Sequence, residues 1–200
     1  MGKILKRGTW ERLTISTNSE PIMIDSRDHM AAEQLAAALR RLIVDRRDEF
    51  GDIVFVCIGT DRATGDALGP LVGHLLASSD LMIYGSLESP VHAGNLMRKM
   101  EVMRLRHNNP LVVAIDACLG SSDKVSKLIV KEGGIAPAMA MGEGLPHVGH
   151  ISIAGIVNVS AGISEQCPLQ VLSATRLWTV MQMAQAVANG LILLRGDGTI

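Results

Sequence analysis

The chain has 200 residues, of which 48% are hydrophobic and 20% are charged. This length is close to that of one domain, and the composition supports a sizeable core, which excludes disorder as a description of the whole chain. The 19 lysine and arginine residues nearly balance the 20 aspartate and glutamate residues. Because no field of one sign is available to attract nucleic acid or an anionic membrane surface, we expect neither as a partner.

The cysteines and the N-terminus indicate the compartment. Cys57, Cys118 and Cys167 form an odd, widely spaced set without CxxC spacing, which is typical of neither a secreted disulfide framework nor a zinc site. The first ten residues include basic side chains but no apolar h-region, and no stretch reaches the roughly 18 to 20 consecutive apolar residues of a membrane span. We therefore expect a cytoplasmic protein without a signal peptide or a membrane anchor.

The chain divides into a short arm and one larger unit. Residues 1–25 mix basic, hydroxyl and apolar side chains without a sustained period, which predicts an irregular N-terminal arm. Residues 26–200 are predicted to form a single α/β domain. It opens with an amphipathic helix over about 28–50, in which Leu35 and Leu39 recur at helical spacing.

Strands and helices then alternate. An apolar run over 53–59 ends in glycine, as expected of a central strand that is buried on both faces. A polar loop over 60–70 follows and leads into a helix, which makes a βα unit. The remaining pattern predicts strands at 81–86, 111–120, 125–132 and 150–160, helices at about 91–106 and 169–194, and a long loop over 133–149.

This alternation predicts a three-layer α/β/α fold. Parallel crossovers place helices on the faces of a sheet, so we expect a mostly parallel sheet between helical layers. In such folds the binding crevice lies at the carboxyl ends of the strands. Polar residues that follow the apolar runs are therefore the candidates for function.

Two aspartates are the strongest candidates for chemistry. Asp116 comes directly after five apolar residues. An acid there is costly to bury unless it is paired or used, and desolvation should raise its pKa. Asp66 stands where a helix is expected to begin, and the helix dipole should lower its pKa. Two carboxylates with different proton affinities suit general acid and base catalysis.

Other interpretations of the first loop stay open. Asp66 could serve only as a helix N-cap. The glycines and threonines before the helix could bind phosphate, with Arg62 in support, but the GxxxxGK[ST] spacing is absent and two acids in the loop would repel an anion.

Further polar residues near the same predicted edge are candidates for substrate binding. The chain has no GxSxG elbow and no HExxH motif, so a serine hydrolase and a zinc protease have no local support. We expect no metal and no cofactor. The candidate substrate-binding residues are Thr60, Asp61, Arg62, Glu88, His92, His150 and Asn158.

Three strings carry a family resemblance: FVCIGTDRATGDALGPLVG from Phe55 to Gly73, AIDACLG from Ala114 to Gly120, and GHISIAGIVNVS from Gly149 to Ser160. Over about residues 30–195 the chain resembles the sporulation protein YyaC family of spore-forming bacteria. That family resembles, more distantly, the germination protease that degrades small acid-soluble spore proteins, and the hydrogenase maturation endopeptidases. The resemblance implies a phosphorylase/hydrolase-like fold and a peptidase ancestry.

The resemblance also implies roles for individual residues. The aspartate of the D-A-L-G-P string falls on Asp66 and that of the D-A string on Asp116, so both are expected to be catalytic. Their substrate would be a protein or peptide in the mother cell or forespore. In the hydrogenase enzymes, acids and a later histidine bind a metal of the client protein, and His150 or His147 is the nearest match here.

Two questions stay open after this comparison. The chain is much shorter than the germination protease and has no recognisable cleavable pro-segment, so a non-catalytic protein-binding or regulatory factor with the same fold is the alternative. The apolar C-terminal helix could cover the sheet or form a subunit contact, so a homo-oligomer is also open.

Overall fold

The computed structural model describes residues 20–137, 145–160 and 167–200. The strands are β1 (Ile22–Asp25), β2 (Ile53–Cys57), β3 (Met82–Tyr84), β4 (Leu111–Gly120), β5 (Lys127–Glu132) and β6 (Ile151–Val159). The α-helices are α1 (Ala31–Val44), α2 (Leu68–Leu75), α3 (Leu96–Arg106), α4 (Pro168–Ser173) and α5 (Leu177–Gly196). Short 3-10 helices are η2 (Arg47–Glu49), η3 (Gly65–Ala67) and η4 (Ser122–Lys124).

The six strands form one sheet in the order β1-β5-β6-β4-β2-β3. β3, β2, β4 and β6 are parallel neighbours, whereas β5 is antiparallel to both β6 and β1. The prediction of an α/β fold with a mostly parallel sheet is therefore confirmed. The parallel strands bring the carboxyl ends of β2, β4 and β6 to one edge.

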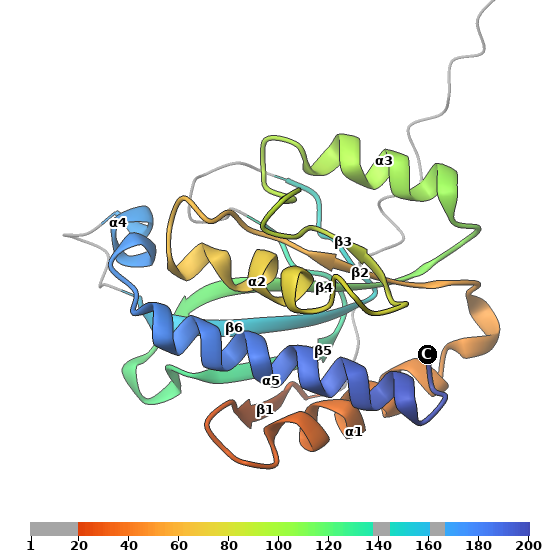
Figure 1. The fold of residues 1–200 in the computed structure, drawn as a ribbon, viewed down its shortest axis with the longest axis horizontal. Coiled ribbons are helices and arrows are strands. Elements are labelled where there is room, and N and C mark those ends of the chain that lie inside the picture. The colour runs from red at the N-terminus through yellow and green to blue at the C-terminus, as the bar shows by residue number, and fades with distance from the viewer. Residues whose placement is uncertain (1–19, 138–144, 161–166) are drawn as a thin grey trace, which may run out of the picture.

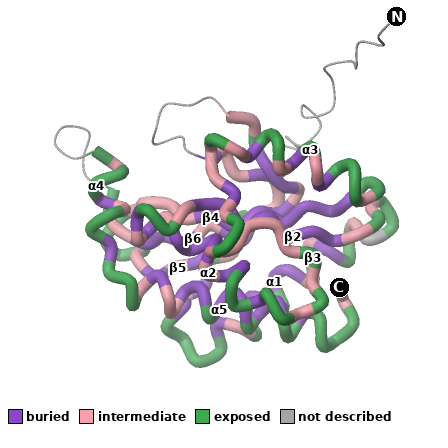
Figure 2. The backbone as a smooth tube through the Cα atoms, turned by 45° about the horizontal axis from the view of Figure 1, so that its top comes forward, coloured by how far each residue is buried: buried purple, intermediate pink, exposed green. Residues whose placement is uncertain are grey.

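Helices cover both faces of this sheet (Figure 1), with α3 on one face and α1, α2 and α5 on the other. Side chains alternate along β4 as the strand period requires. Val113 and Ile115 belong to the core beneath α1, α2 and α5, whereas Val112 and Ala114 belong to the smaller core beneath α3. The burial map in Figure 2 shows that the most continuous buried backbone runs through these central strands.

Helix α5 packs beside α1 on the larger core. Its inward side includes Val180, Met183, Val187 and Leu191, all fully buried. By length and composition alone, α5 is apolar enough to cross a membrane, and 50% of that apolar window is buried inside the protein. A core helix passes the same test, and packing against the sheet accounts for the buried half of this window.

Several boundaries differ from those expected. Residues 22–25 form an edge strand paired with β5, whereas an irregular arm was predicted for 1–25; the rest of that arm lies mostly outside the described residues. The helix predicted from about 91 begins only at Leu96, because Val91 forms a bridge with Ile58 of the sheet. The predicted C-terminal helix is two helices, separated by an extended backbone at Arg176.

Candidate active site

The site forms where β2 ends beside β4. β2 stops at Cys57, and Ile58 then donates its N–H to the carbonyl of Ile115 over 2.7 Å. β4 continues to Gly120 with β6 as its neighbour. Asp116 therefore lies within β4, inside the strand predicted for 111–120 and next to the point at which β2 leaves the sheet. By strand alternation its side chain shares the face of Ala114.

Asp66 reaches this point on the loop that follows β2. Its Oδ2 accepts a hydrogen bond from the backbone N–H of Thr60 over 2.8 Å, and the same N–H also donates to the Asp66 carbonyl at 3.2 Å. The loop from 60 to 66 is thus closed on itself. Asp66 lies in η3, and neither η3 nor α2 has a side-chain cap, so the N-cap interpretation of Asp66 is wrong.

Gly59 makes this closure possible. Its φ of +135° is a backbone conformation that other residues rarely adopt, and a Cβ atom built there would lie 2.0 Å from the Asp66 carbonyl oxygen. The Gly59 N–H donates to the carbonyl of Val91 over 2.8 Å, which ties the loop to the segment before α3. The glycine at the end of the predicted strand is therefore needed to bring Asp66 back to the sheet.

The two carboxyl groups interact. Asp116 is only 7% exposed, and burial raises its pKa well above the usual range; the negative charge of Asp66 raises the pKa further. The Ala117 N–H, which donates to Asp116 Oδ1 over 2.8 Å, opposes this shift by lowering the pKa. The pKa of Asp116 is therefore raised, as predicted from desolvation, and the charge of Asp66 adds to the effect.

Burial also raises the pKa of Asp66, against the lowering effects of the Thr60 hydrogen bond and of the charge of His92. The expected lowering of this pKa is therefore wrong, because burial outweighs the hydrogen bond from Thr60 and the Asp66 carboxylate caps no helix. Since Asp66 is less buried than Asp116 and has two groups that favour its charged form, it ionises first. The negative charge of Asp66 then raises the pKa of Asp116.

His92 acts on the pair through its charge, which lowers the pKa of Asp66. Asn95 holds it: the His92 N–H donates to Asn95 Oδ1 over 3.0 Å, and the Asn95 amide group lies 3.2 Å from His92 Nε2. The Asn95 amide also donates to the Pro90 carbonyl at 3.0 Å, which fixes its orientation. With the amide as donor, Nε2 is the acceptor and the proton of a neutral ring is on Nδ1.

His150 lies at the opposite end of the parallel strands from the two aspartates, at their amino ends. It immediately precedes β6, and its Nδ1 accepts the N–H of Val112, near the start of β4, over 3.0 Å. Its ring packs against Phe50 with centroids 4.5 Å apart. Burial, followed by the charge of Arg46, lowers the pKa of His150 to about 4. Its predicted place beside the substrate is therefore wrong, because it stands at the amino end of its strand.

His147 does not approach the aspartates either. Its ring nitrogen lies 3.4 Å from the Gly134 carbonyl, next to the isolated bridge between Ile135 and Val148. The expected third metal ligand from His147 or His150 thus does not converge on the pair. Across residues 20–137, 145–160 and 167–200, no group of three or more His, Cys, Asp or Glu side chains is arranged to hold a metal ion.

Asn158 lies at the carboxyl edge but bonds to protein. Its amide group donates to the Val171 carbonyl at 3.2 Å and to Thr175 Oγ1 at 3.1 Å, and so it ties β6 to α4. A Cβ at Gly65 would lie 2.9 Å from Leu172 Cδ2 of α4 and 2.9 Å from Thr175 Oγ1, so α4 and Thr175, just after it, pack closely against η3. Asn158 thereby supports the loop that carries Asp66. The sequence analysis did not identify Thr175, whose hydroxyl accepts the hydrogen bond from Asn158.

The other predicted binding residues differ in exposure and in the bonds that they make. The Thr60 N–H is used by Asp66, and its hydroxyl contacts Asp61 at 3.5 Å. Asp61, Arg62 and Glu88 are exposed. Asp61 and Arg62 are on the same loop as Asp66, and Glu88 is on the turn after β3. These three side chains are available to a ligand, whereas the Thr60 N–H is not a free donor.

The cysteines near this edge are poor nucleophiles. Burial raises the pKa of the Cys57 thiol to about 12. Burial, followed by the charge of Asp116, raises that of Cys118 to about 11. Because the thiolate is the reactive form, both thiols are inert near neutral pH.

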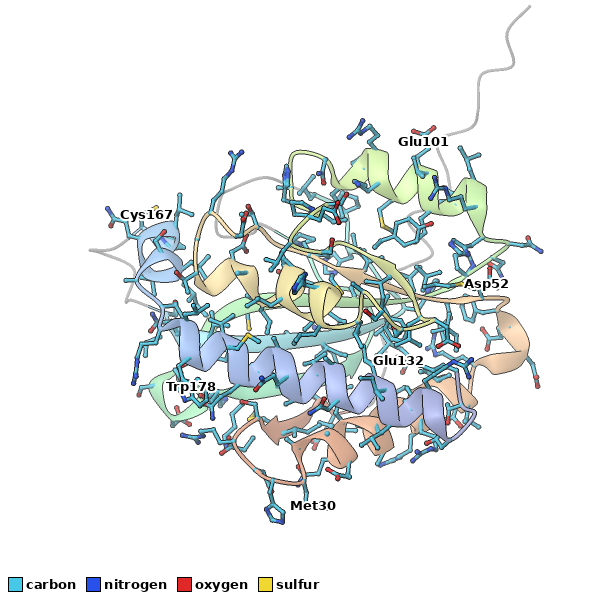
Figure 3. All side chains as sticks on the ribbon, viewed as in Figure 1. Met30, Asp52, Glu101, Glu132, Cys167 and Trp178 are labelled. Carbon is cyan, nitrogen blue, oxygen red and sulfur yellow. The ribbon has the colours of Figure 1, made fainter. Side chains whose placement is uncertain are left out.

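The arrangement suits reactions in which one proton is shared by two carboxyl groups. A buried, protonated Asp116 can donate a proton, and a partly buried, ionised Asp66 can accept one. Figure 3 locates this edge: Cys167, which precedes α4, and Asp52, which precedes β2, lie at opposite ends of the molecule. Because α4 packs against η3, the aspartates belong to the Cys167 end.

Comparisons with known proteins identify the family. Residues 23–190 match a family model described as "Protein of unknown function (DUF1256)". The chain is also 44% identical, over 169 residues, to the "Uncharacterized protein YyaC" of Bacillus subtilis (strain 168); the alignment covers 83% of this chain and 80% of that protein. Both matches include the loop with Asp66 and the strand with Asp116. The chain belongs to the YyaC family.

Proposed function

We propose that this protein is a peptidase that uses Asp66 and Asp116 to activate water. The observation that carries the proposal is the placement of the two acids: the closed loop with Asp66 follows β2 at the point where Ile58 bonds to Ile115, the residue before the 7% exposed Asp116. The charge of Asp66 raises the pKa of Asp116, in keeping with this placement. Two carboxyl groups that cannot easily ionise together hold one proton between them over a wide pH range.

In this proposal Asp66 accepts a proton from water, whose oxygen attacks the carbonyl carbon of the scissile peptide bond. Asp116 donates its proton to the leaving amide nitrogen. When His92 is protonated, its charge lowers the pKa of Asp66 and so favours the ionised form of the base. The similarity to the germination protease that the Asp66 and Asp116 strings suggest supports the same roles, and a cytoplasmic setting during sporulation is part of the proposal.

The test is cleavage of an unfolded protein substrate. Small acid-soluble spore proteins should be incubated with the wild type, Asp66→Asn and Asp116→Asn, and fragments followed by mass spectrometry. Asp123→Asn is the matched control, because Asp123 is an exposed acid in the turn that follows β4. The proposal requires cleavage by the wild type and the control and its loss in both site variants. Equal cleavage by all four proteins would point to a contaminating protease and refute the assignment.

A non-catalytic protein-binding factor is the second candidate. It is favoured by the deep burial of Asp116 and by a groove of about 700 Å³ that is lined by β3 and α3 and not by the aspartates. A binding factor should hold a protein partner equally well in the wild type and in Asp116→Asn, with no fragments formed by either. Turnover that depends on Asp116 would exclude it.

A further inference from the structure

The edge strand β3 borders the groove of about 700 Å³, which we call the β3 groove. Its walls are β3 with the turn that follows it, the outer side of α3, and the end of α2. The volume is within the range of about 300 to 1,000 Å³ that is usual for ligand sites. The groove therefore has the dimensions of a binding site, although no sequence pattern drew attention to it.

The charged side chains that line the β3 groove are basic. Arg98, Lys99 and Arg106 of α3 contribute to the lining together with His107, and the lining contains no aspartate or glutamate. Lys99 Nζ donates to the hydroxyl of Ser89 over 2.9 Å, and Arg98 and Arg106 are exposed. Since the whole chain is nearly neutral, this clustering of cations is local. It favours an anionic partner.

The strand beneath these cations has an open side. β3 is the last strand in the sheet order and pairs with β2 alone among the described strands. Met82 is 41% exposed. An edge strand offers backbone N–H and C=O groups on its unpaired side, and an extended peptide can add to it as a further strand. The open edge thus favours an extended chain over a compact small molecule.

Two residues that line the β3 groove, Tyr84 and His107, are held in place by contacts within the protein. The Tyr84 hydroxyl lies 3.0 Å from His107 Nε2, and His107 Nδ1 lies 2.8 Å from Asp52 Oδ2. This chain of contacts joins β3 to the end of α3 and to the residue before β2. A preformed wall reduces the ordering cost of binding.

We propose that the β3 groove binds an extended acidic segment of a partner protein as an added strand, with the cations of α3 paired to its carboxylates. Ser86 and Ser89, in the turn after β3, line the groove, and His92, which acts on Asp66, follows three residues after Ser89. A bound segment would therefore be directed toward the aspartates. Binding at the groove does not depend on cleavage.

The test is fluorescence anisotropy with the full-length protein and a short, labelled, end-blocked peptide of alternating glutamate and valine. Asp116→Asn should be used beside the wild type, so that binding is measured where cleavage is not expected. A peptide with lysine for glutamate tests charge, and one with N-methyl groups along one edge tests strand addition. The site variant is Arg98→Glu/Arg106→Glu; the control is Arg41→Glu/Lys124→Glu, two exposed positions outside the groove.

The acidic peptide should bind saturably, more weakly as salt rises, and the lysine peptide should not bind. The groove variant and the N-methylated peptide should each weaken binding about tenfold or more, while the control variant should not change it. The proposal is overturned by absence of saturable binding at low salt, by equal weakening in the control variant, or by unchanged binding of the N-methylated peptide. A wild-type dimer in solution that the groove variant separates would also overturn it, because a second copy would then occupy the groove.

Discussion

The carboxylate of Asp66 raises the pKa of Asp116, although the two residues are 50 positions apart in the chain. The sheet accounts for this meeting: β4 continues past the point where β2 stops, and the loop after β2 turns back over the gap. One acid is fixed in a strand and the other in a closed loop. The pair is therefore positioned by backbone hydrogen bonds and does not depend on flexible side chains.

A first prediction concerns stability. The folded-state pKa of Asp116 is raised above 3.8, so the folded protein binds more protons than the unfolded chain above that pH. The contribution of this carboxyl to stability is present at low pH and is lost as pH rises through the folded-state pKa. Asp116→Asn, which keeps an oxygen for the Ala117 N–H, should therefore raise Tm at pH 7, by roughly 2 to 4 °C for each kcal/mol gained.

Calorimetry of the wild type and Asp116→Asn at pH 7 and pH 4 measures this effect. The gain in Tm should be larger at pH 7 than at pH 4. In Asp123→Asn, which removes an exposed acid whose pKa is lowered by the Ser121 hydroxyl, Tm should not rise at pH 7. A lower Tm for Asp116→Asn at pH 7 would mean that Asp116 is charged and stabilised in the fold.

A second prediction concerns the loop. Gly59→Ala places a methyl group against the Asp66 carbonyl and forces a residue with a side chain into a positive φ, so unfolding free energy should fall by about 2 kcal/mol or more. Gly198→Ala is the matched control, since Gly198 also has a positive φ of +78° but nothing within 4 Å of its Cβ position. Urea denaturation should show a larger loss of unfolding free energy in Gly59→Ala, which adds the clash to the backbone strain, than in Gly198→Ala, which has the strain alone. Equal losses in the two variants would contradict the close approach of Gly59 to the Asp66 carbonyl.

A third prediction concerns His150. Its pKa is about 4 in the fold against 6.5 in the unfolded chain, so it contributes stability that is complete above pH 6.5 and is lost as pH falls toward 4. The loss should be about 2 to 3 kcal/mol. His150→Asn, which retains an acceptor for the Val112 N–H, should reduce this dependence in urea denaturation. His74→Gln, an exposed change, should leave it intact; a wild-type stability that is flat over this window would exclude the assignment.

Much of the sheet could be predicted from the sequence. β2 and the first five residues of β4 are continuous apolar runs because both faces of these strands are covered, and the rule that function lies at carboxyl ends of parallel strands selected Asp66 and Asp116. The same rule was applied too broadly to β6. His150 directly precedes that strand and Asn158 is its second-to-last residue, so they lie at opposite ends of it, and only Asn158 is at the carboxyl end.

Other features depend on contacts that leave no local pattern. The pKa of Asp66 rises because the folded loop buries its carboxyl group, and the hydrogen bond from Thr60 only opposes that rise. From the sequence, a helix start was the more usual interpretation of an acid before an apolar helical run. The cations of α3 look like an ordinary solvated helix face in the sequence. They line a groove only because β3 ends the sheet beside them. Long-range packing, which single-sequence periodicity does not encode, decides both.

The most direct measurement of the paired-acid account is a carbon-13 NMR titration of the Asp116 carboxyl in the wild type and in Asp66→Asn. In the wild type, Asp116 should titrate well above 3.8. In Asp66→Asn its pKa should fall, because the neighbouring charge is gone, yet remain above 3.8 because burial persists. If Asp116 titrates at the same pH in both proteins, the two carboxyl groups do not share a proton and the account is wrong.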